Sequence, residues 1–225
     1  MLILAIDTSG RRGSVALCRG DANSFETLQL SALDGGTYSA RLVPMLSEIL
    51  EQHEITMTDV DGFAIVSGPG SFTGLRVGLA TVKGLCEVLH TPLSTVSMLE
   101  AIAVTHGADG ETVTALLDAG RGEVYVGAYQ LNAPGALAVR EYITKLNDFD
   151  AASEGLRELL TPDVAVVDFL RAKGSAVRLV VPVEADGIGR IGLRKLLRGQ
   201  VVDYAIIDVN YIRRSDAEIL SAPKR

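Results

Sequence analysis

Two short runs place an aspartate at the end of an apolar segment and follow it with a turn of small residues. They are Asp7-Thr8-Ser9-Gly10 and Asp118-Ala119-Gly120. A carboxylate at such a position can orient the water around a magnesium ion, while the amides of the turn face phosphate groups. Asp7, Thr8, Ser9 and Asp118 are therefore candidate nucleotide-binding residues. Taken singly, each aspartate is more often a turn or capping residue, so the significance lies in the pair.

A glycine-rich turn is the third candidate for chemistry. Residues 67–74 read Ser-Gly-Pro-Gly-Ser-Phe-Thr-Gly and precede a predicted helix, whose free amides could receive an anion. The run lacks the Lys-Ser/Thr ending of a P-loop and does not fit G-x-G-x-x-G. It can equally be a rigid loop that sets the direction of the helix, and both interpretations stay open at this stage.

The sequence offers no recognisable nucleophile or metal centre. His53, His90 and His106 are far apart, and no two of them stand four residues apart as a helix-borne zinc pair would. No serine occupies a G-x-S-x-G motif. Cys18 and Cys86 are isolated, as expected of small buried residues in a reduced protein. We therefore expect no catalytic residues and no bound metal.

The composition favours a mixed α/β core over a nucleic-acid platform. Of the 225 residues 48% are hydrophobic, only 5% are aromatic and none is tryptophan, whereas single-stranded nucleic acid is bound on aromatic faces. A net charge of −7 also disfavours nucleic-acid binding by the chain's own surface. From Arg190 onward, however, eight basic residues stand against four acidic ones. We interpret this basic stretch as a hint of an acidic partner.

Apolar periodicity places the candidate runs on a duplicated framework. Strands are expected at residues 2–6, 13–18 and 25–31, and again at 63–66, 113–117, 123–130, 164–167 and 177–181. Helices are expected near 40–53, 73–89, 98–104 and 193–197, and residues 131–162 read as loop and irregular helix. The second strand–turn–strand unit repeats the first, with an aspartate at the same place.

The repeat predicts the fold class and the domains. Two aspartate loops in matching positions indicate a duplicated actin-like ATPase (ASKHA, ribonuclease H-like) α/β fold with a degenerate second half. We assign residues 1–106 plus about 205–225 to a first domain. Residues 107–204 form the second, smaller domain.

Two apolar stripes follow helical spacing on the helices near 40–53 and 73–89. Gly74 and Gly78 lie one turn apart on the second of these helices, where a missing side chain lets another backbone approach. We predict that both stripes form a seam for a partner. The predicted interface residues are Leu42, Leu46, Ile49, Gly74, Leu75, Gly78, Leu79 and Val82.

Several runs resemble the TsaB (YeaZ) family. They are residues 4–9, 66–78, 96–100, 118–125 and the run Asn210-Tyr211-Ile212-Arg213. The motif Gly-Pro-Gly-Ser-Phe-Thr-Gly-Leu-Arg at residues 68–76 is highly specific. It is shared with the sister family TsaD, the catalytic subunit once labelled a glycoprotease. The resemblance covers residues 1–130 well and about 203–218 in addition, whereas residues 131–202 match loosely.

The resemblance implies a non-catalytic protein. TsaD carries a His-x-x-x-His metal pair on the helix after its third strand, where this chain reads Tyr38-Ser39-Ala40-Arg41-Leu42. TsaB relatives often have a histidine near Tyr38, so this position departs slightly from the family. The Gly-Gly adenosine turn of TsaD is also missing, and Gly187-Ile188-Gly189 is a poor substitute. We therefore expect no required cofactor and weak or absent ATP and magnesium binding.

The family also implies partners. TsaB pairs with a TsaD-type catalytic subunit through its N-terminal helices, and the pair recruits a TsaE-type ATPase. The assembly transfers a threonylcarbamoyl group to the adenosine next to the anticodon of tRNAs that read ANN codons. We expect a homodimer through the same surface when the chain is alone, and contact with tRNA only through the complex. Because the apolar run at residues 2–6 is too short for a signal peptide or a membrane span, we expect a cytoplasmic protein without membrane contact.

Other functions stay open beside this one. An actin-like kinase for a small metabolite would explain both aspartate loops, but it needs an intact ATP cleft. A glycopeptidase, which older family labels suggest, lacks its metal ligands. A free-standing tRNA-binding module is disfavoured by charge and aromatic content.

Overall fold

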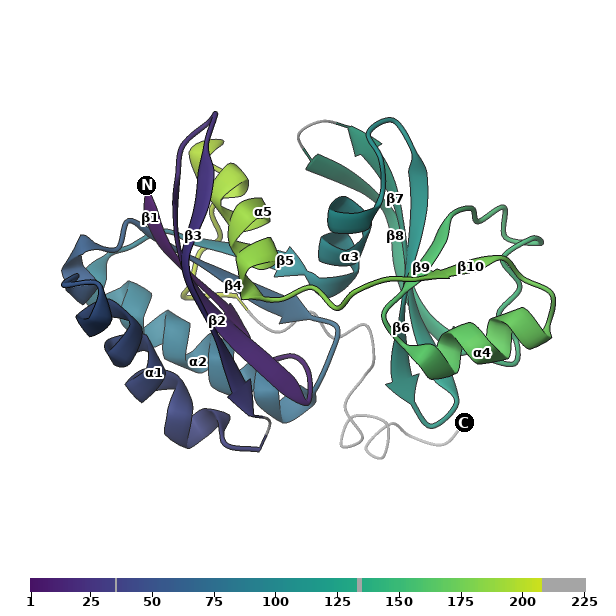
Figure 1. Cartoon of the computed structure of the whole chain (residues 1–225), viewed down its shortest axis with the longest axis horizontal. Helices are drawn as coiled ribbons and strands as arrows, with labels where there is room; N and C mark the ends of the chain where they lie inside the picture. Colours follow the sequence, from purple (N-terminus) through teal and green to yellow (C-terminus); the bar gives the residue numbers. More distant parts are fainter. Residues whose placement is uncertain (35, 133–134, 208–225) are drawn as a thin grey trace.

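The computed structural model describes residues 1–34, 36–132 and 135–207, which form two α/β domains side by side (Figure 1). The first sheet contains β1 (Leu2–Asp7), β2 (Arg12–Gly20), β3 (Phe25–Asp34), β4 (Gly62–Gly68) and β5 (Leu93–Ser97). The second contains β6 (Thr112–Gly120), β7 (Glu123–Asn132), β8 (Gly135–Lys145), β9 (Leu159–Thr161) and β10 (Val177–Leu179). The helices are α1 (Tyr38–Gln52), α2 (Phe72–Leu89), α3 (Met98–His106), α4 (Val164–Ala172) and α5 (Ala185–Leu197), with a 3₁₀ turn η1 (Met57–Asp59).

Both sheets have the same topology. The first runs in the order β3-β2-β1-β4-β5 and the second in the order β8-β7-β6-β9-β10. In the first sheet β1 pairs with β2 and β2 with β3 in antiparallel fashion, whereas β4 is parallel to β1 and β5 is parallel to β4. The second sheet repeats these pairings with β6 to β10 in the places of β1 to β5. The predicted duplicated actin-like α/β fold is therefore confirmed, because the chain repeats the whole strand order and not only the aspartate loop.

The helices divide the molecule differently from the predicted domains. Helix α5 packs on β1, β2, β4 and β5, whereas α3 packs mainly on the second sheet. Small residues make the α5 contact possible, since a Cβ on Gly189 would lie 2.9 Å from the Cys18 sulfur. The assignment of residues 107–204 to one domain is thus wrong for α5, which belongs to the first sheet, and the assignment of residues 1–106 is wrong for α3, which lies mainly on the second. The part of the predicted first domain beyond residue 207 lies outside the described residues.

Two local predictions are also corrected. Residues 135–145, expected as loop or irregular helix, form strand β8 at the edge of the second sheet. Residues 164–167, expected as a strand, begin helix α4, whose Val166, Val167 and Leu170 pack against the second sheet. Gly187-Ile188-Gly189 lies within α5 and is no adenosine turn.

The core is nearly continuous from one domain to the other. One cluster of buried residues extends from β1 and β4 through Leu99 and Ile102 of α3 to β6 and β7, and a smaller cluster fills the space between the second sheet and α4. Within residues 1–34, 36–132 and 135–207, no helix has both the length and the hydropathy needed to cross a membrane.

Candidate interdomain cleft and partner face

The first aspartate loop is a buried turn. Asp7 ends β1 and is 4% exposed, and its Oδ1 accepts hydrogen bonds from the Ser9 amide at 2.8 Å and the Ser9 hydroxyl at 2.6 Å. Burial raises the pKa of Asp7, and the two bonds from Ser9 oppose this rise only in part. Thr8 is 1% exposed, and its hydroxyl has no hydrogen-bond partner among the described residues.

Glycines hold this loop against α2. A Cβ on Gly74 would overlap the Thr8 carbonyl oxygen, and one on Gly78 would overlap the Thr8 hydroxyl. At the start of α2, the Ser71 amide donates to the Ser9 carbonyl at 2.6 Å. The glycine-rich turn therefore holds the first loop against the start of α2, and the Ser71 amide is engaged within the chain.

The second aspartate loop repeats this turn in the other domain. The Gly120 amide donates to Asp118 Oδ1 at 2.9 Å, across the same two-residue spacing as Asp7 and Ser9. The Asp118 amide donates in turn to Asp163 Oδ2 at 2.8 Å. Burial and then the charge of Asp118 raise the pKa of Asp163. The sequence pattern does not predict Asp163 as a residue of the site, because it indicates a strand at residues 164–167. Asp163 in fact directly precedes helix α4.

The two loops face each other across a cleft between the domains. A cavity of about 400 Å³ is lined by Asp7, Ser9, Asp118 and Asp163 together with arginines 11 and 12. A neighbouring cavity of about 690 Å³ is lined by the first loop, the start of α2 and Asp118. The structure thus brings together Asp7, Ser9 and Asp118, while Thr8 points away into the contact with α2. Across the described part of the chain, no three His, Cys, Asp or Glu side chains are grouped as metal ligands.

Tyr38 closes the cleft at the start of α1. Its hydroxyl donates to the Gly10 carbonyl at 2.8 Å, and a Cβ on Gly13 would lie 2.9 Å from its ring. Burial, followed by the charges of Asp7 and Asp34, raises the pKa of Tyr38 to about 12. Tyr38 therefore stays neutral at physiological pH and acts as a structural clasp on the first loop.

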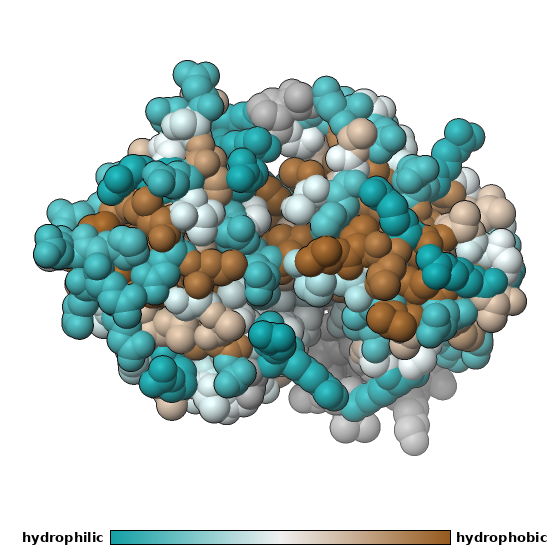
Figure 2. Space-filling view, viewed as in Figure 1, coloured by the Kyte–Doolittle hydropathy of each residue, from teal (hydrophilic) through white to brown (hydrophobic). Residues whose placement is uncertain are grey.

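The predicted partner seam is wrong in its residues. All eight are buried within this one chain; the six apolar members are Leu42, Leu46, Ile49, Leu75, Leu79 and Val82, and the glycines are Gly74 and Gly78. The stripes of α1 and α2 cover the first sheet, and the glycines accommodate Thr8. In Figure 2 the surface over α1 is mostly hydrophilic, consistent with an apolar stripe turned inward.

A different side of α2 is exposed. Thr73, Ala80, Gly84 and Val88 lie on it, with Val88 78% exposed. A Cβ on Gly84 would meet no atom within 4 Å. Small residues let a neighbouring helix approach closely. The outer side of α2 therefore offers a close-packing surface that the predicted seam residues do not.

The comparisons with known proteins agree with this geometry. A family profile described as TsaD: tRNA N6-adenosine threonylcarbamoyltransferase matches residues 36–174. Over 130 residues the chain is 35% identical to the tRNA threonylcarbamoyladenosine biosynthesis protein TsaB of Bacillus subtilis (strain 168), covering 58% of this chain and 56% of that protein. Over 141 residues it is 39% identical to TsaB of Escherichia coli (strain K12), covering 60% and 58%. The chain thus matches little more than half the length of these curated relatives.

The solved structures extend the likeness to the whole fold. YeaZ from Pseudomonas aeruginosa superposes with a TM-score of 0.71 at 25% identity, covering 92% of this chain and 98% of that one. A second Pseudomonas aeruginosa structure, of a protein described as similar to peptidase YEAZ, gives a TM-score of 0.74 at 26% identity and covers 94% of this chain and 99% of that one. The fold and cleft define a two-domain protein of the actin-like class. The chain belongs to the family of the TsaD profile, and within it to the TsaB (YeaZ) branch.

Proposed function

We propose that this chain is a non-catalytic subunit in the formation of threonylcarbamoyladenosine on tRNA. In this role it pairs with a TsaD-type catalytic subunit and works with a TsaE-type ATPase, and it meets tRNA within that assembly. The observation that carries the proposal is the family match over residues 36–174, together with two relatives named for this biosynthesis.

The start of α1 supports an accessory role. Where TsaD carries its histidine pair, this chain has Tyr38-Ser39-Ala40-Arg41-Leu42. Tyr38 binds the Gly10 carbonyl, and Leu42 is 1% exposed in the core. Two of the five positions thus serve packing, and none has a side chain that a metal ion favours.

The outer side of α2 supports pairing. Ala80, Gly84 and Val88 are exposed beside Arg76 and Glu87, and at Ala80 and Gly84 the backbone of α2 is open to a helix of a second protein. A second copy of this chain would use the same surface, so the homodimer and the pair with the catalytic subunit should compete. The six buried apolar residues of the predicted seam support this pairing indirectly, because they hold α1 and α2 against the first sheet.

An actin-like kinase is the second candidate. It is favoured by one observation, namely that Asp7 and Asp118 line a single cavity between the domains. Two contacts weigh against tight nucleotide binding: Asp7 is enclosed by Ser9, and the Ser71 amide at the start of α2 is already bonded to Ser9. We propose that ATP and magnesium bind weakly or not at all, and that no cofactor is required.

Pairing can be tested directly. The chain is mixed with the TsaD-type protein of its own organism, and the molar mass is measured by light scattering after gel filtration. We expect a complex containing both proteins, formed at the expense of the homodimer. If the two proteins elute separately at every ratio, and the mixture modifies no tRNA when a TsaE-type ATPase is added, the proposal is wrong.

A further inference from the structure

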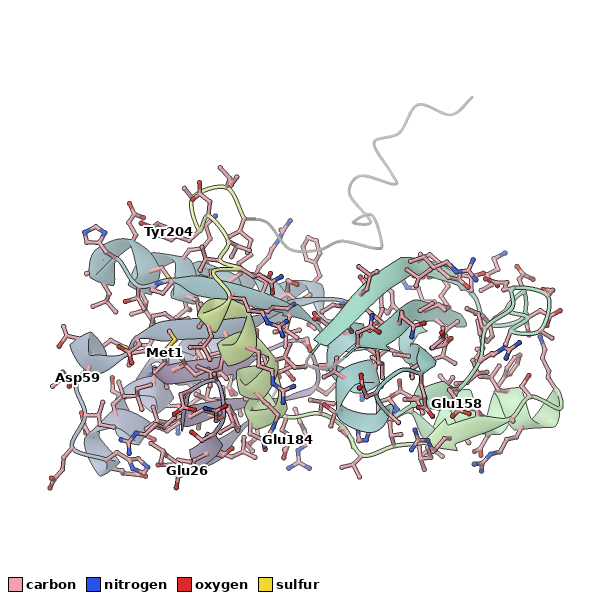
Figure 3. All side chains as sticks on the ribbon, turned by 90° about the horizontal axis from the view of Figure 1, so that it is seen from above. Met1, Glu26, Asp59, Glu158, Glu184 and Tyr204 are labelled. Carbon is pink, nitrogen blue, oxygen red and sulfur yellow. The ribbon has the colours of Figure 1, made fainter. Side chains whose placement is uncertain are left out.

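Three arginines form a stripe along α5 and its C-terminal cap. Arg190, Arg194 and Arg198 stand four residues apart, so they lie on one side of the helix at steps of about 6 Å. Arg190 and Arg198 are exposed, and Arg194 is half-buried. Figure 3 shows α5 beside the boundary between the two domains, with Glu184 at its start. The arginine stripe and Lys195 are the described part of the basic stretch noted in the sequence, and the other arginines and lysines of that stretch lie beyond residue 207.

The stripe is not neutralised within the described residues. Arg194 and Arg198 form no ion pair there, and Arg190 stacks on the Phe25 ring with its guanidinium 4.4 Å from the ring centre. Like charges four residues apart on a helix repel each other. Burial, followed by the charges of Arg190 and Arg198, lowers the pKa of Arg194. The folded chain thus tolerates three cations in a row whose repulsion an anion would relieve.

The nearest carboxylates beside the stripe have other partners. Glu100 accepts the Lys195 ammonium group at 2.6 Å, and Glu141 accepts the Ser97 hydroxyl, also at 2.6 Å, as well as the Tyr129 hydroxyl. Glu184 and Asp186, at the beginning of α5, share one cavity with Arg190 and Arg194, and Glu100 and Glu141 share the other with Arg194 and Arg198. Because these two carboxylates bind Lys195, Ser97 and Tyr129, Arg194 and Arg198 are left without an ion pair in the described part of the chain.

Two grooves flank the stripe. One, of about 550 Å³, lies between α5 and the second sheet and is lined by Arg194, Lys195 and Arg198 together with Glu100, Glu141 and Tyr129. The other, of about 490 Å³, is lined by Arg190 and Arg194. Because Arg194 borders both, the cations follow a continuous open surface, which suits a row of anions better than a single one.

We propose that the arginine stripe of α5 binds successive phosphate groups of the tRNA backbone. This inference rests on the proposed function, which makes RNA the polyanion that the assembly meets. The net charge of −7 repels RNA from most of the chain, so contact would be confined to this stripe. It would position the tRNA without reading its bases.

The test measures tRNA affinity by fluorescence anisotropy at several salt concentrations, with the chain alone and with its catalytic partner. The double variant Arg194→Ala/Arg198→Ala should bind about 10-fold more weakly. The slope of log K against the logarithm of the salt concentration should become less negative by about 2, because two phosphate contacts are lost. Arg194→Lys/Arg198→Lys should keep most of the salt dependence, since it keeps both charges.

The matched control is Arg19→Ala/Arg157→Ala, which removes two exposed arginines elsewhere. It should leave affinity and salt dependence nearly unchanged. Both double variants should unfold at the same urea concentration as the original chain. If the stripe variant and the control bind tRNA equally, the inference is wrong, even where pairing and modification succeed. If Arg194→Ala/Arg198→Ala loses affinity for pyrophosphate but binds tRNA as tightly as the original chain, the stripe binds a small phosphate compound. That result also excludes the RNA contact.

Discussion

The Thr8 hydroxyl fills the space in which a side chain on Gly78 would stand. This contact joins the first aspartate loop to the middle of α2, and it explains why a helix interior keeps a glycine that costs about 1 kcal/mol relative to alanine. Gly78 therefore makes room for the first aspartate loop of the cleft and does not form a contact surface for a partner protein.

The first prediction concerns this contact. Gly78→Leu should destabilise the chain by about 1–3 kcal/mol or more, because the new side chain must displace Thr8 and Ile65, whose Cδ1 would lie 3.3 Å from a Cβ at this position. Urea unfolding measures the change. A Gly78→Leu chain as stable as the original would show that α2 is free to move away from the loop.

The second prediction uses the same substitution six residues further along α2. Gly84→Leu should preserve or slightly raise stability, because the position is open and leucine favours helix. It should weaken pairing with the catalytic subunit and with a second copy by about 5- to 150-fold, as expected for 1–3 kcal/mol of overpacking. Sedimentation velocity gives both affinities. Unchanged pairing in both complexes would place the partner surface elsewhere.

The third prediction follows from the burial of Asp7. Its pKa in the folded chain is raised above the ordinary value of 3.8, so the folded state holds the proton to higher pH than the unfolded state. The contribution of Asp7 to stability is therefore complete below about pH 3.8 and declines as pH rises through the folded pKa. Asp7→Asn keeps an oxygen acceptor for Ser9 but cannot ionise, and it should escape this decline.

Urea unfolding of both proteins between pH 4 and pH 7 tests this. The stability of Asp7→Asn relative to the original chain should increase with pH over this range. A relative stability that falls as pH rises would mean that the ionised carboxylate stabilises the loop, contrary to the effect of burial. Ser9→Asn changes the hydrogen-bond partner of Asp7 and leaves the Asp7 carboxyl group in place. The stability of this variant relative to the original chain should therefore not increase with pH as that of Asp7→Asn does.

The fourth prediction concerns the cleft. Calorimetry with magnesium and ATP should give a dissociation constant no tighter than roughly 100 μM, which is about −5.5 kcal/mol. The reason is that Asp7 and the Ser71 amide are already engaged by Ser9. A low-micromolar constant that Asp7→Ala abolishes would favour the kinase alternative.

The aspartate loops and the duplication could be predicted because each loop ends an apolar strand, a signal contained in neighbouring residues. The seam was mispredicted for a different reason. Helical spacing shows that Leu42 and Leu79 share an apolar face, but it cannot show whether a sheet of the same chain or a partner covers that face. The contact between Thr8 and Gly78 joins residues 70 positions apart, which no local pattern records.

The second domain was harder to predict because its patterns are ambiguous. The valine-rich start of α4 resembles a strand, and only the spacing of Val166, Val167 and Leu170 indicates a helix. Strand β8 exposes Leu137 and Val139, so its alternation is weak. Asp163 could have been found from its place directly before the helix, had α4 been recognised.

The central claim is that this chain is required for tRNA modification but performs no transfer itself. The most direct measurement is the yield of threonylcarbamoyladenosine, quantified by mass spectrometry after digestion of tRNA, in a reaction reconstituted with the TsaD-type and TsaE-type proteins, ATP and the threonylcarbamoyl adenylate. We expect full modification with this chain present, a loss of at least about 100-fold when it is omitted, and none with this chain alone. Equal yield with and without the chain, or modification by the chain alone, would contradict the account.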